Sequence, residues 1–319
     1  MKPLSNASNS FSGKIFNIAV LVAALGYFVD IYDLVLFSTV RVKSLQDLGL
    51  QGQTLTDQGI HILNMQMIGM LLGGILWGIM GDKRGRISVL FGSIFLYSLA
   101  NLANAFVHTP QYYAIWRFVA GIGLAGELGA GITLVSETLP KNKRGYGTMI
   151  VATVGVSGAV VAGIIAHYFN WRTAYILGGC LGFALLALRI GVHESGMFSK
   201  IQSEGIQRGS FFSLFNHRKR FYKYLLCILI GLPTWYVIGV LVTLGPEFSK
   251  ALSIQGPPVK GEFAIMCCYA GLVLGDFLSG FLSQKLKSRK RIVIGFLLLS
   301  SVVMGFYFSS HGQSSFYFY

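Results

Sequence analysis

The stretch Gly78-Ile79-Met80-Gly81-Asp82-Lys83-Arg84-Gly85-Arg86 is a short charged segment between two apolar runs. Residues 60–80 contain no Asp, Glu, Lys or Arg, and neither do residues 87–107. Each run is about 20 residues long, the length that a helix needs to cross the hydrocarbon core of a bilayer. A cation-rich connection between two such runs predicts a cytoplasmic hairpin between two membrane-spanning helices.

The composition is that of a membrane protein. The 319 residues are 53% hydrophobic and 12% charged, with a mean hydropathy of +0.61, whereas soluble domains carry about 25% charged residues. The formal net charge of +14 does not indicate nucleic acid as a partner, because the cations lie between apolar runs and not among polar surface residues. We therefore expect the lipid bilayer as a partner, and not nucleic acid.

The positions of the apolar runs and of the cations predict the topology. The predicted spans cover residues 15–40, 60–80, 87–107, 111–136, 147–168, 171–190, 223–245, 262–284 and 292–309, and a further span begins at Phe316. Lysine and arginine are concentrated in every second connection, which predicts a cytoplasmic N-terminus. The longest basic connection divides the chain into an N-terminal six-helix bundle over 1–192, a cytoplasmic linker over 193–222 and a partial C-terminal bundle over 223–319.

Residues of the first charged hairpin recur in the same order later in the chain. The corresponding pairs are Gly73 and Gly275, Gly78 and Gly280, Asp82 and Gln284, and Lys83 and Lys285. Such a repeat predicts two parallel halves related by an axis along the membrane normal. The second copy has lost its acid, because Gln284 stands in the position of Asp82.

Ionisable residues inside the predicted spans are the candidates for function. Asp30 and Asp33 are one turn apart on one face of the first span, and Arg117 and Glu127 lie in the fourth. A carboxylate in mid-membrane costs about 3 kcal/mol unless it is protonated or paired. We expect Asp33 to pair with Arg117, so that protonation and pairing compete for one carboxylate, as a proton carrier requires. The alternative is a static ion pair that joins two helices.

These motifs resemble those of one transporter family. The pattern Gly78-x3-Asp82-Lys83-x-Gly85-Arg86 resembles the signature loop of the major facilitator superfamily. Asp30-Ile31-Tyr32-Asp33 and Arg117-x3-Gly121-x-Gly123-x2-Gly126-Glu127 resemble helices 1 and 4 of its metabolite:proton symporters, with the phosphate:proton symporters as the nearest rival. The resemblance implies an all-α integral membrane protein of the major facilitator fold, with a complete N-terminal six-helix bundle and part of the C-terminal bundle.

The resemblance also implies roles at the cytoplasmic face. In this superfamily the acid of the signature loop caps a helix of the opposite half, and the arginines pair with acids such as Glu137, which precedes Pro140 and Arg144 here. A carboxylate at a helix N-terminus contributes about 0.3–1 kcal/mol, enough to bias two conformations of similar free energy. The alternative is that the cations only set the topology. The implied gating residues are Gly78, Asp82, Lys83, Arg84, Gly85, Arg86, Glu137 and Arg144.

Candidate substrate contacts are fewer. The seventh span is interrupted at Pro233, and a proline in mid-membrane is tolerated where the helix lines a cavity. Trp235 and Tyr236 follow this proline, and Gln66 is a polar residue of the second span. We take these three as candidate substrate contacts, with helix packing as the alternative for the aromatic pair.

The expected function is a proton-coupled symporter of a bacterial inner membrane. It would import a small polar metabolite, such as an organic acid, an amino acid or osmolyte, or phosphate, by alternating access. The chain offers no nucleotide-binding loop, nucleophilic triad or metal-ligand spacing, so we expect no enzymatic activity, cofactor or metal. Because the implied fold has further helices after the tenth span, the alternative is a truncated, non-transporting membrane fragment of such a carrier.

Overall fold

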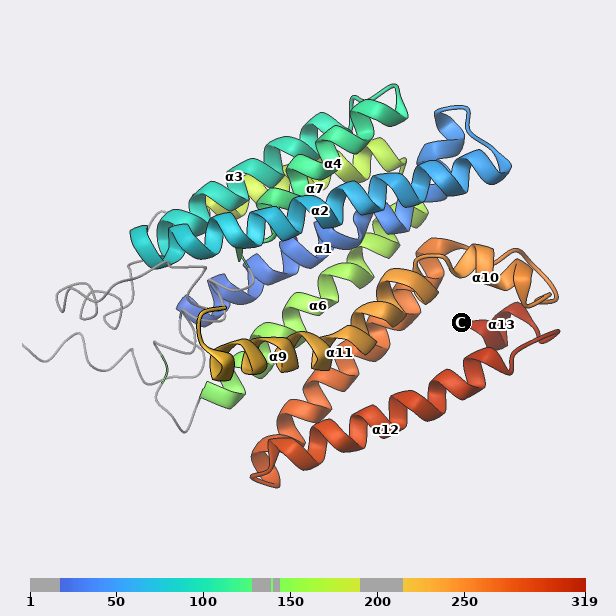
Figure 1. Ribbon diagram of the computed structural model, residues 1–319. Coiled ribbons are helices and arrows are strands. Elements are labelled where there is room, and N and C mark those ends of the chain that lie inside the picture. Colours follow the sequence, from blue (N-terminus) through green and yellow to red (C-terminus); the bar gives the residue numbers. More distant parts are fainter. Residues whose placement is uncertain (1–17, 128–138, 140–143, 190–214) are drawn as a thin grey trace, which may run out of the picture.

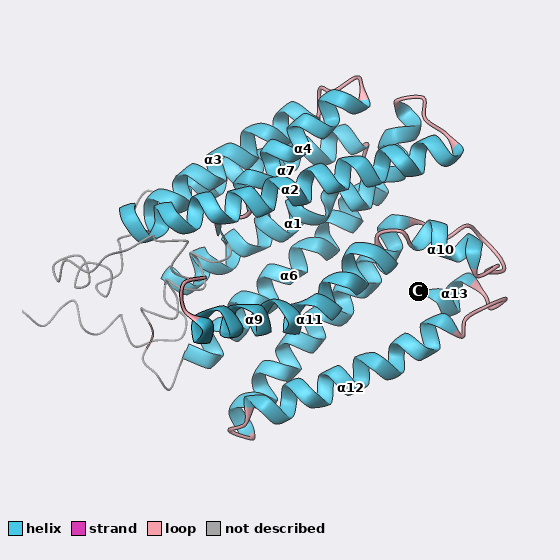
Figure 2. Ribbon diagram, viewed as in Figure 1, coloured by secondary structure: helices cyan, strands magenta, loops and turns pink. Residues whose placement is uncertain are grey.

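The computed structural model describes residues 18–127, 139, 144–189 and 215–319 (Figure 1). Throughout these residues the regular structure is helical and no strand is present (Figure 2), so the predicted all-α class is confirmed. The helices are α1 (Ile18–Asp47), α2 (Gly52–Arg84), α3 (Arg86–Asn104), α4 (Pro110–Leu124), α6 (Arg144–Tyr168), α7 (Trp171–Leu188), α9 (Arg218–Tyr236), the π-helix η2 (Val237–Val242), α10 (Gly245–Ala251), α11 (Gly261–Lys285), α12 (Arg289–Phe308) and α13 (Ser315–Phe318).

Most described helices have the length and composition of membrane spans. Among the described residues, 7 helices meet this description, and α3 is a shorter apolar helix. The helices that meet it are α1, α2, α6, α7, α9 with η2, α11 and α12. The predicted fourth span begins as expected with α4, capped by the Thr109 side chain, which accepts from the N–H of Tyr112. The rest of that span, from residue 128, lies outside the described residues.

The charged hairpin is tighter than the sequence predicts. Helix α2 continues through Asp82 and Lys83 to Arg84, and only Gly85 separates it from α3. Gly85 has φ of 96°, a conformation that residues with a side chain rarely adopt. Lys83 and Arg84 lie in the last turn of α2, where cations interact favourably with the helix dipole. The helix therefore extends beyond the apolar run that marks the predicted span.

Helix α9 also begins before the predicted span. It starts at Arg218, inside the segment 193–222 that the sequence assigns to a linker. The first turn is basic and exposed, so the helix continues past its apolar part, as α2 does. Pro233 lies inside α9, and the π-helix η2 follows directly. The expected interruption of the seventh span is thus a change of helix type.

Glycines allow the helices of the first bundle to approach closely. A Cβ at Gly69 would overlap the carbonyl of Phe118, which joins α2 to α4, and a Cβ at Gly158 would overlap the carbonyl of Phe28, which joins α6 to α1. Helices α3 and α7 also pack closely, because a Cβ at Gly179 would overlap the side chain of Leu102. Small residues at helix contacts are the usual packing solution in membranes.

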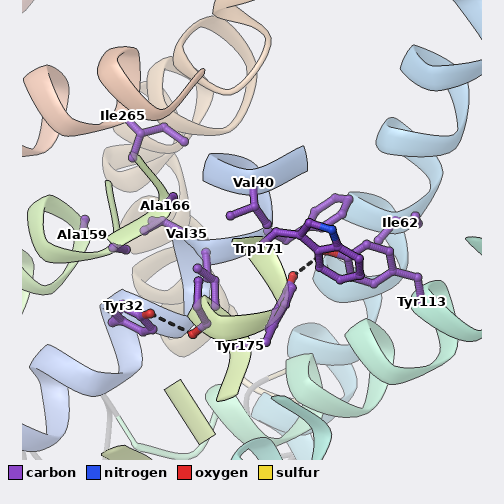
Figure 3. Packing of buried hydrophobic residues seen from close by; sticks show 14 of the residues in the cluster. Tyr32, Val35, Val40, Ile62, Tyr113, Ala159, Ala166, Trp171, Tyr175 and Ile265 are labelled. Atoms are coloured by element: carbon purple, nitrogen blue, oxygen red, sulfur yellow. Dashed lines mark hydrogen bonds between the residues drawn. The ribbon is translucent and has the colours of Figure 1, made fainter. Parts of the chain in front are cut away.

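The core lies where α1, α4, α6 and α7 meet. Figure 3 shows the Tyr32 hydroxyl donating to the carbonyl of Ala174, at 2.8 Å, which ties α1 to α7. The Tyr113 ring stacks on Trp171 with centroids 5.8 Å apart, and its hydroxyl donates to Tyr175 at 2.9 Å (Figure 3). These aromatic residues fix the relative positions of the helices that carry the buried charges.

Helix α11 joins the later helices to the first bundle. It lies along α6 and also contacts α1, whereas α12 contacts α11 and runs apart from the first bundle (Figure 1). The repeat found in the sequence has a structural counterpart, because α2 ends one residue after Lys83 and α11 ends at Lys285. The Gln284 amide lies against Gly145 in the first turn of α6, where a Cβ on the glycine would overlap it.

Candidate functional site

Arg117 is fully buried and is held by neutral groups. Its Nε donates to the Gln66 side chain at 3.3 Å, and one terminal nitrogen donates to the Asn101 side chain at 3.2 Å. The other terminal nitrogen donates to the backbone carbonyl of Asp33 at 3.1 Å. Arg117 also lies over the ring of Tyr175, 5.7 Å from its centroid. The cation is therefore positioned by α1, α2 and α3, with no carboxylate in ion-pair contact among the described residues.

Asp33 lies beside Arg117 but is not bonded to it through the carboxylate. Both carboxylate oxygens are buried and lack a hydrogen-bond partner within the described residues. The guanidinium of Arg117 is close enough to interact electrostatically with this carboxylate. The two residues are adjacent, as expected, but the bond between them involves the Asp33 backbone, because the Arg117 side chain is directed by Gln66 and Asn101.

A second group of charges lies on the other side of Asp33. Arg189, the residue that caps the C-terminus of α7, forms an ion pair with Glu127. The Tyr97 hydroxyl lies 3.5 Å from the other oxygen of Glu127. Asp30 interacts electrostatically with Glu127, Arg189 and Asp33. In the described part of the chain no donor meets hydrogen-bond geometry at its oxygens, and its carboxyl lies within hydrogen-bonding reach of the Glu127 carboxyl. Glu127 lies three residues beyond the end of α4, and Asp33 interacts electrostatically with both Arg117 and Glu127, so the charges form one continuous group.

Glycine 178 leaves space for the Asp33 carboxylate. A Cβ at this position would overlap Oδ1 of Asp33 and approach the Tyr32 ring to 3.0 Å. We predict that Gly178→Ala lowers the free energy of unfolding by about 1–3 kcal/mol, because overpacking forces these side chains to shift. Thermal unfolding in detergent measures the change.

Gly74→Ala is the matched control for that substitution. A Cβ at Gly74 has no neighbour within 4 Å, and alanine favours the helix over glycine. The control should therefore be neutral or slightly stabilising. If both variants unfold at the same temperature, Asp33 is not confined by α7 as described here.

The predicted gating residues lie in different environments. Asp82, Lys83 and Arg84 are exposed at the end of α2. Arg144 donates to the carbonyl of Leu139 at 2.8 Å. Gly78 lies inside α2, and Gly85 follows its last residue. Glu137 lies outside the described residues, as does the side chain of Arg86.

The predicted substrate contacts differ in burial. Gln66 is buried and donates to the carbonyl of Leu34 at 3.1 Å while it accepts from Arg117. Trp235 and Tyr236 are 52% and 48% exposed on α9. Only Gln66 is thus part of the buried polar cluster.

Two ion pairs join the bundles at the end of α1 remote from Asp30. Arg41, which is fully buried, contacts Glu247 of α10 at 2.8 Å and donates to the carbonyl of Thr243 at 3.2 Å. Lys43 contacts Glu262 of α11 at 2.9 Å and donates to the carbonyl of Ala166. At this end the later helices are therefore held against the first bundle by charge as well as by packing.

Sequence reasoning missed several of these partners. Asn101 carries no charge, and Arg189 stands at the end of an apolar run, far from Glu127 in the sequence. Glu247 and Glu262 are separated from α1 by most of the chain. The spacing within one helix defines its faces, but it does not say which side chain of another helix reaches them.

A comparison with known protein families shows which family the chain belongs to. The pattern described as Major Facilitator Superfamily matches residues 14–319. The chain belongs to the Major Facilitator Superfamily. The predicted family, the multi-pass membrane character and the absence of an enzymatic role are confirmed, because this is a family of membrane transporters.

Several curated transporters are similar in sequence. A putative metabolite transport protein of Haemophilus influenzae is 28% identical over 89% of this chain and 70% of its own length. The sialic acid transporter NanX of Escherichia coli is 25% identical over 93% of this chain and 72% of its own length. The niacin transporter NiaP of Acinetobacter baylyi is 30% identical, but the match spans 56% of this chain and only 41% of that transporter.

A solved structure shares the fold. The proton:xylose symporter XylE, in complex with 6-bromo-6-deoxy-D-glucose, superposes with a TM-score of 0.64 at 19% identity, over 84% of this chain and 69% of that chain. This superposition confirms the predicted major facilitator architecture of a first six-helix bundle followed by helices of the second.

Proposed function

We propose that this protein is a proton-coupled importer of small organic carboxylates, located in a bacterial inner membrane with its N-terminus in the cytoplasm. Asp33 binds the coupled proton and Arg117 binds the carboxylate of the substrate. Asp30 and Glu127 lie beside the path. The two halves then expose the site alternately to the two sides of the membrane.

The observation that carries the proposal is the environment of Arg117. Its hydrogen-bond acceptors are the Gln66 amide, the Asn101 amide and a backbone carbonyl, all of them neutral. A buried guanidinium that makes no ion pair can accept an anion, and a carboxylate is the group that its planar fork binds best. The unpaired Asp33 carboxylate beside it is the group that a proton neutralises when the substrate anion occupies the arginine.

The names of the relatives support this substrate class. Niacin and sialic acid, the solutes for which two of them are named, are both carboxylic acids and are anions at neutral pH. An anion that enters with a proton does not have to carry net charge against the negative potential of the cytoplasm, which costs about 2.3 kcal/mol per charge at 100 mV.

Uptake by the purified protein in liposomes tests the proposal. The probes are niacin, sialic acid and benzoate, with nicotinamide as the matched compound that lacks the carboxylate. We expect at least one acid to accumulate when the outside is acidic, and not when a protonophore is present, while nicotinamide does not accumulate. Protein-free liposomes control for passive entry of the undissociated acids.

Other results would contradict the proposal. Accumulation of nicotinamide to the same level as niacin would show that Arg117 does not select a carboxylate. If an acid exchanges across the membrane but the pH gradient has no effect, the protein is a carrier that is not coupled to protons. The absence of both uptake and exchange for every probe would favour the non-transporting fragment.

The ion pairs at the far end of α1 give a prediction about alternating access. Replacing Glu247 and Glu262 by glutamine leaves the buried Arg41 without its anionic partner, and such a loss costs several kcal/mol. We predict that the double variant Glu247→Gln/Glu262→Gln opens this end. The measurement is the distance between spin labels at Gln53→Cys and Lys250→Cys, in a background whose 4 cysteines are replaced by serine.

The matched control for the double glutamine variant keeps both negative charges. Glu247→Asp/Glu262→Asp keeps both charges and should leave the label distance near that of the unsubstituted protein. If the glutamine variant gives an unchanged distance distribution as well, the ion pairs do not hold this end closed.

A further inference from the structure

Five ionisable side chains share one buried cluster. They are Asp30, Asp33, Arg117, Glu127 and Arg189, and none is more than 4% exposed. They come from α1, from the fourth span and from the end of α7. The proposed function uses Asp33 and Arg117 and leaves Arg189 unassigned.

The charges of the cluster do not balance when every group is ionised. Three carboxylates face two arginines, so the sum of the charges is −1. A net charge that is buried away from water is strongly disfavoured, and a buried group changes its protonation state instead. A single proton makes the cluster neutral.

The contacts indicate which groups share that proton. Glu127 is engaged by Arg189, and Arg117 donates to neutral acceptors and to the Asp33 backbone. Within the described residues, no donor meets hydrogen-bond geometry at the carboxylates of Asp30 and Asp33, and the Asp30 carboxyl lies within hydrogen-bonding reach of the Glu127 carboxyl, so a proton between them belongs to Asp30. Asp30 interacts with two other acids, Asp33 and Glu127, so an ionised Asp30 would face repulsion from both sides.

Among the residues that the structure describes, the other titratable groups that interact with Asp30 or Asp33 do not change this sum. They are tyrosines, which are neutral over the physiological pH range. Those that interact with one or both aspartates are Tyr27 and Tyr32 of α1, Tyr97 of α3 and Tyr175 of α7. Asp276 of α11 interacts with Tyr27.

We propose that the substrate-free cluster binds one exchangeable proton, held by Asp30 and shared with Asp33, and that Arg189 is a positioning residue that keeps Glu127 ionised. The proposal rests on the proposed function and deepens it, because it counts the protons that the site holds before the substrate and its coupled proton enter. A substrate with one carboxylate on Arg117 lowers the sum to −2, so by the same rule a second proton, on Asp33, enters with each substrate and transport is electroneutral.

The carbonyl-stretch infrared band of protonated carboxylic acids tests this count without any substrate. Difference spectra between each purified variant and the unsubstituted protein cancel the signals of all other carboxyl groups. Glu127→Gln removes one negative charge, so Arg189 can engage Asp30, and we expect the loss of one protonated carboxyl. Arg189→Gln removes one positive charge, and we expect the gain of one.

Charge-matched variants separate this effect from a general disturbance of the fold. The double variant Glu127→Gln/Arg189→Gln restores the sum to −1 and should restore one protonated carboxyl, while Arg189→Lys should leave the band unchanged. Asp57→Asn, at an exposed residue of α2, should also change nothing. Asp30→Glu keeps the charge and should shift the band, because the proton then resides on a different side chain.

The contrary results are specific. A band that persists in Glu127→Gln would show that charge balance does not set the proton count, and a band unshifted in Asp30→Glu would place the proton elsewhere. Either result overturns this inference while uptake driven by a proton gradient still stands. If the band changes as predicted but no acid is taken up, the proposed function is wrong and the inference about the proton site stands.

Discussion

Asp33→Asn is expected to abolish accumulation driven by a proton gradient. The asparagine occupies the same space in the pocket beside Gly178 but cannot exchange a proton at neutral pH. A gradient of one pH unit supplies about 1.4 kcal/mol per proton, which supports ~10-fold accumulation. We expect this ratio to fall to equality in the variant, measured as the internal concentration of the transported acid in liposomes.

Exchange provides the control for this loss. Because Arg117 donates to the backbone carbonyl of Asp33 and not to its carboxylate, the substitution leaves the contacts of Arg117 in place, and labelled substrate should still exchange with unlabelled substrate. Asp57→Asn should retain full accumulation. If Asp33→Asn still accumulates substrate to a level that follows the pH gradient, the assignment of Asp33 is wrong.

Arg117→Lys is expected to raise the KM for the transported acid by about 10- to 100-fold. Lysine keeps the charge, but it cannot reach Gln66, Asn101 and the Asp33 carbonyl at once, and hydrogen bonds to charged groups contribute about 1.5–3 kcal/mol each. Initial rates of uptake over a range of substrate concentrations give the KM.

A second arginine serves as the control for this substitution. Arg172 also donates to backbone carbonyls, those of Ala105 and Val107, at 2.8 and 3.0 Å. It lies at the N-terminus of α7 and outside the buried cluster. Arg172→Lys should therefore leave the KM unchanged. Equal effects of the two substitutions would mean that Arg117 acts on stability alone.

Much of the fold is predictable from the sequence because a bilayer constrains it. The apolar runs on either side of Asp82 predict two spans, and α2 and α3 contain them. The ends of helices are less predictable. Residues 81–84 and 218–220 are charged and continue the helices beyond the apolar runs, since a helix does not end where the bilayer ends.

The candidate site was predictable in part. The sequence places Asp30 and Asp33 on one face of a helix, and the structure finds both buried with Arg117 nearby. It does not predict that Arg117 donates to the Asp33 backbone, or that Arg189 engages Glu127. Those contacts depend on how α2, α3 and α7 pack, which the periodicity of α1 does not encode. The functional roles of these residues stay predictions.

Proton movement in step with the substrate is the most direct test of the central claim. The acid that accumulates in the uptake experiment is added to lightly buffered liposomes that carry no gradient, and the external pH is followed. The account predicts immediate alkalinisation that depends on the protein, is abolished in Asp33→Asn and is absent with nicotinamide. Uptake of the acid by the unsubstituted protein without any change in external pH would contradict proton coupling.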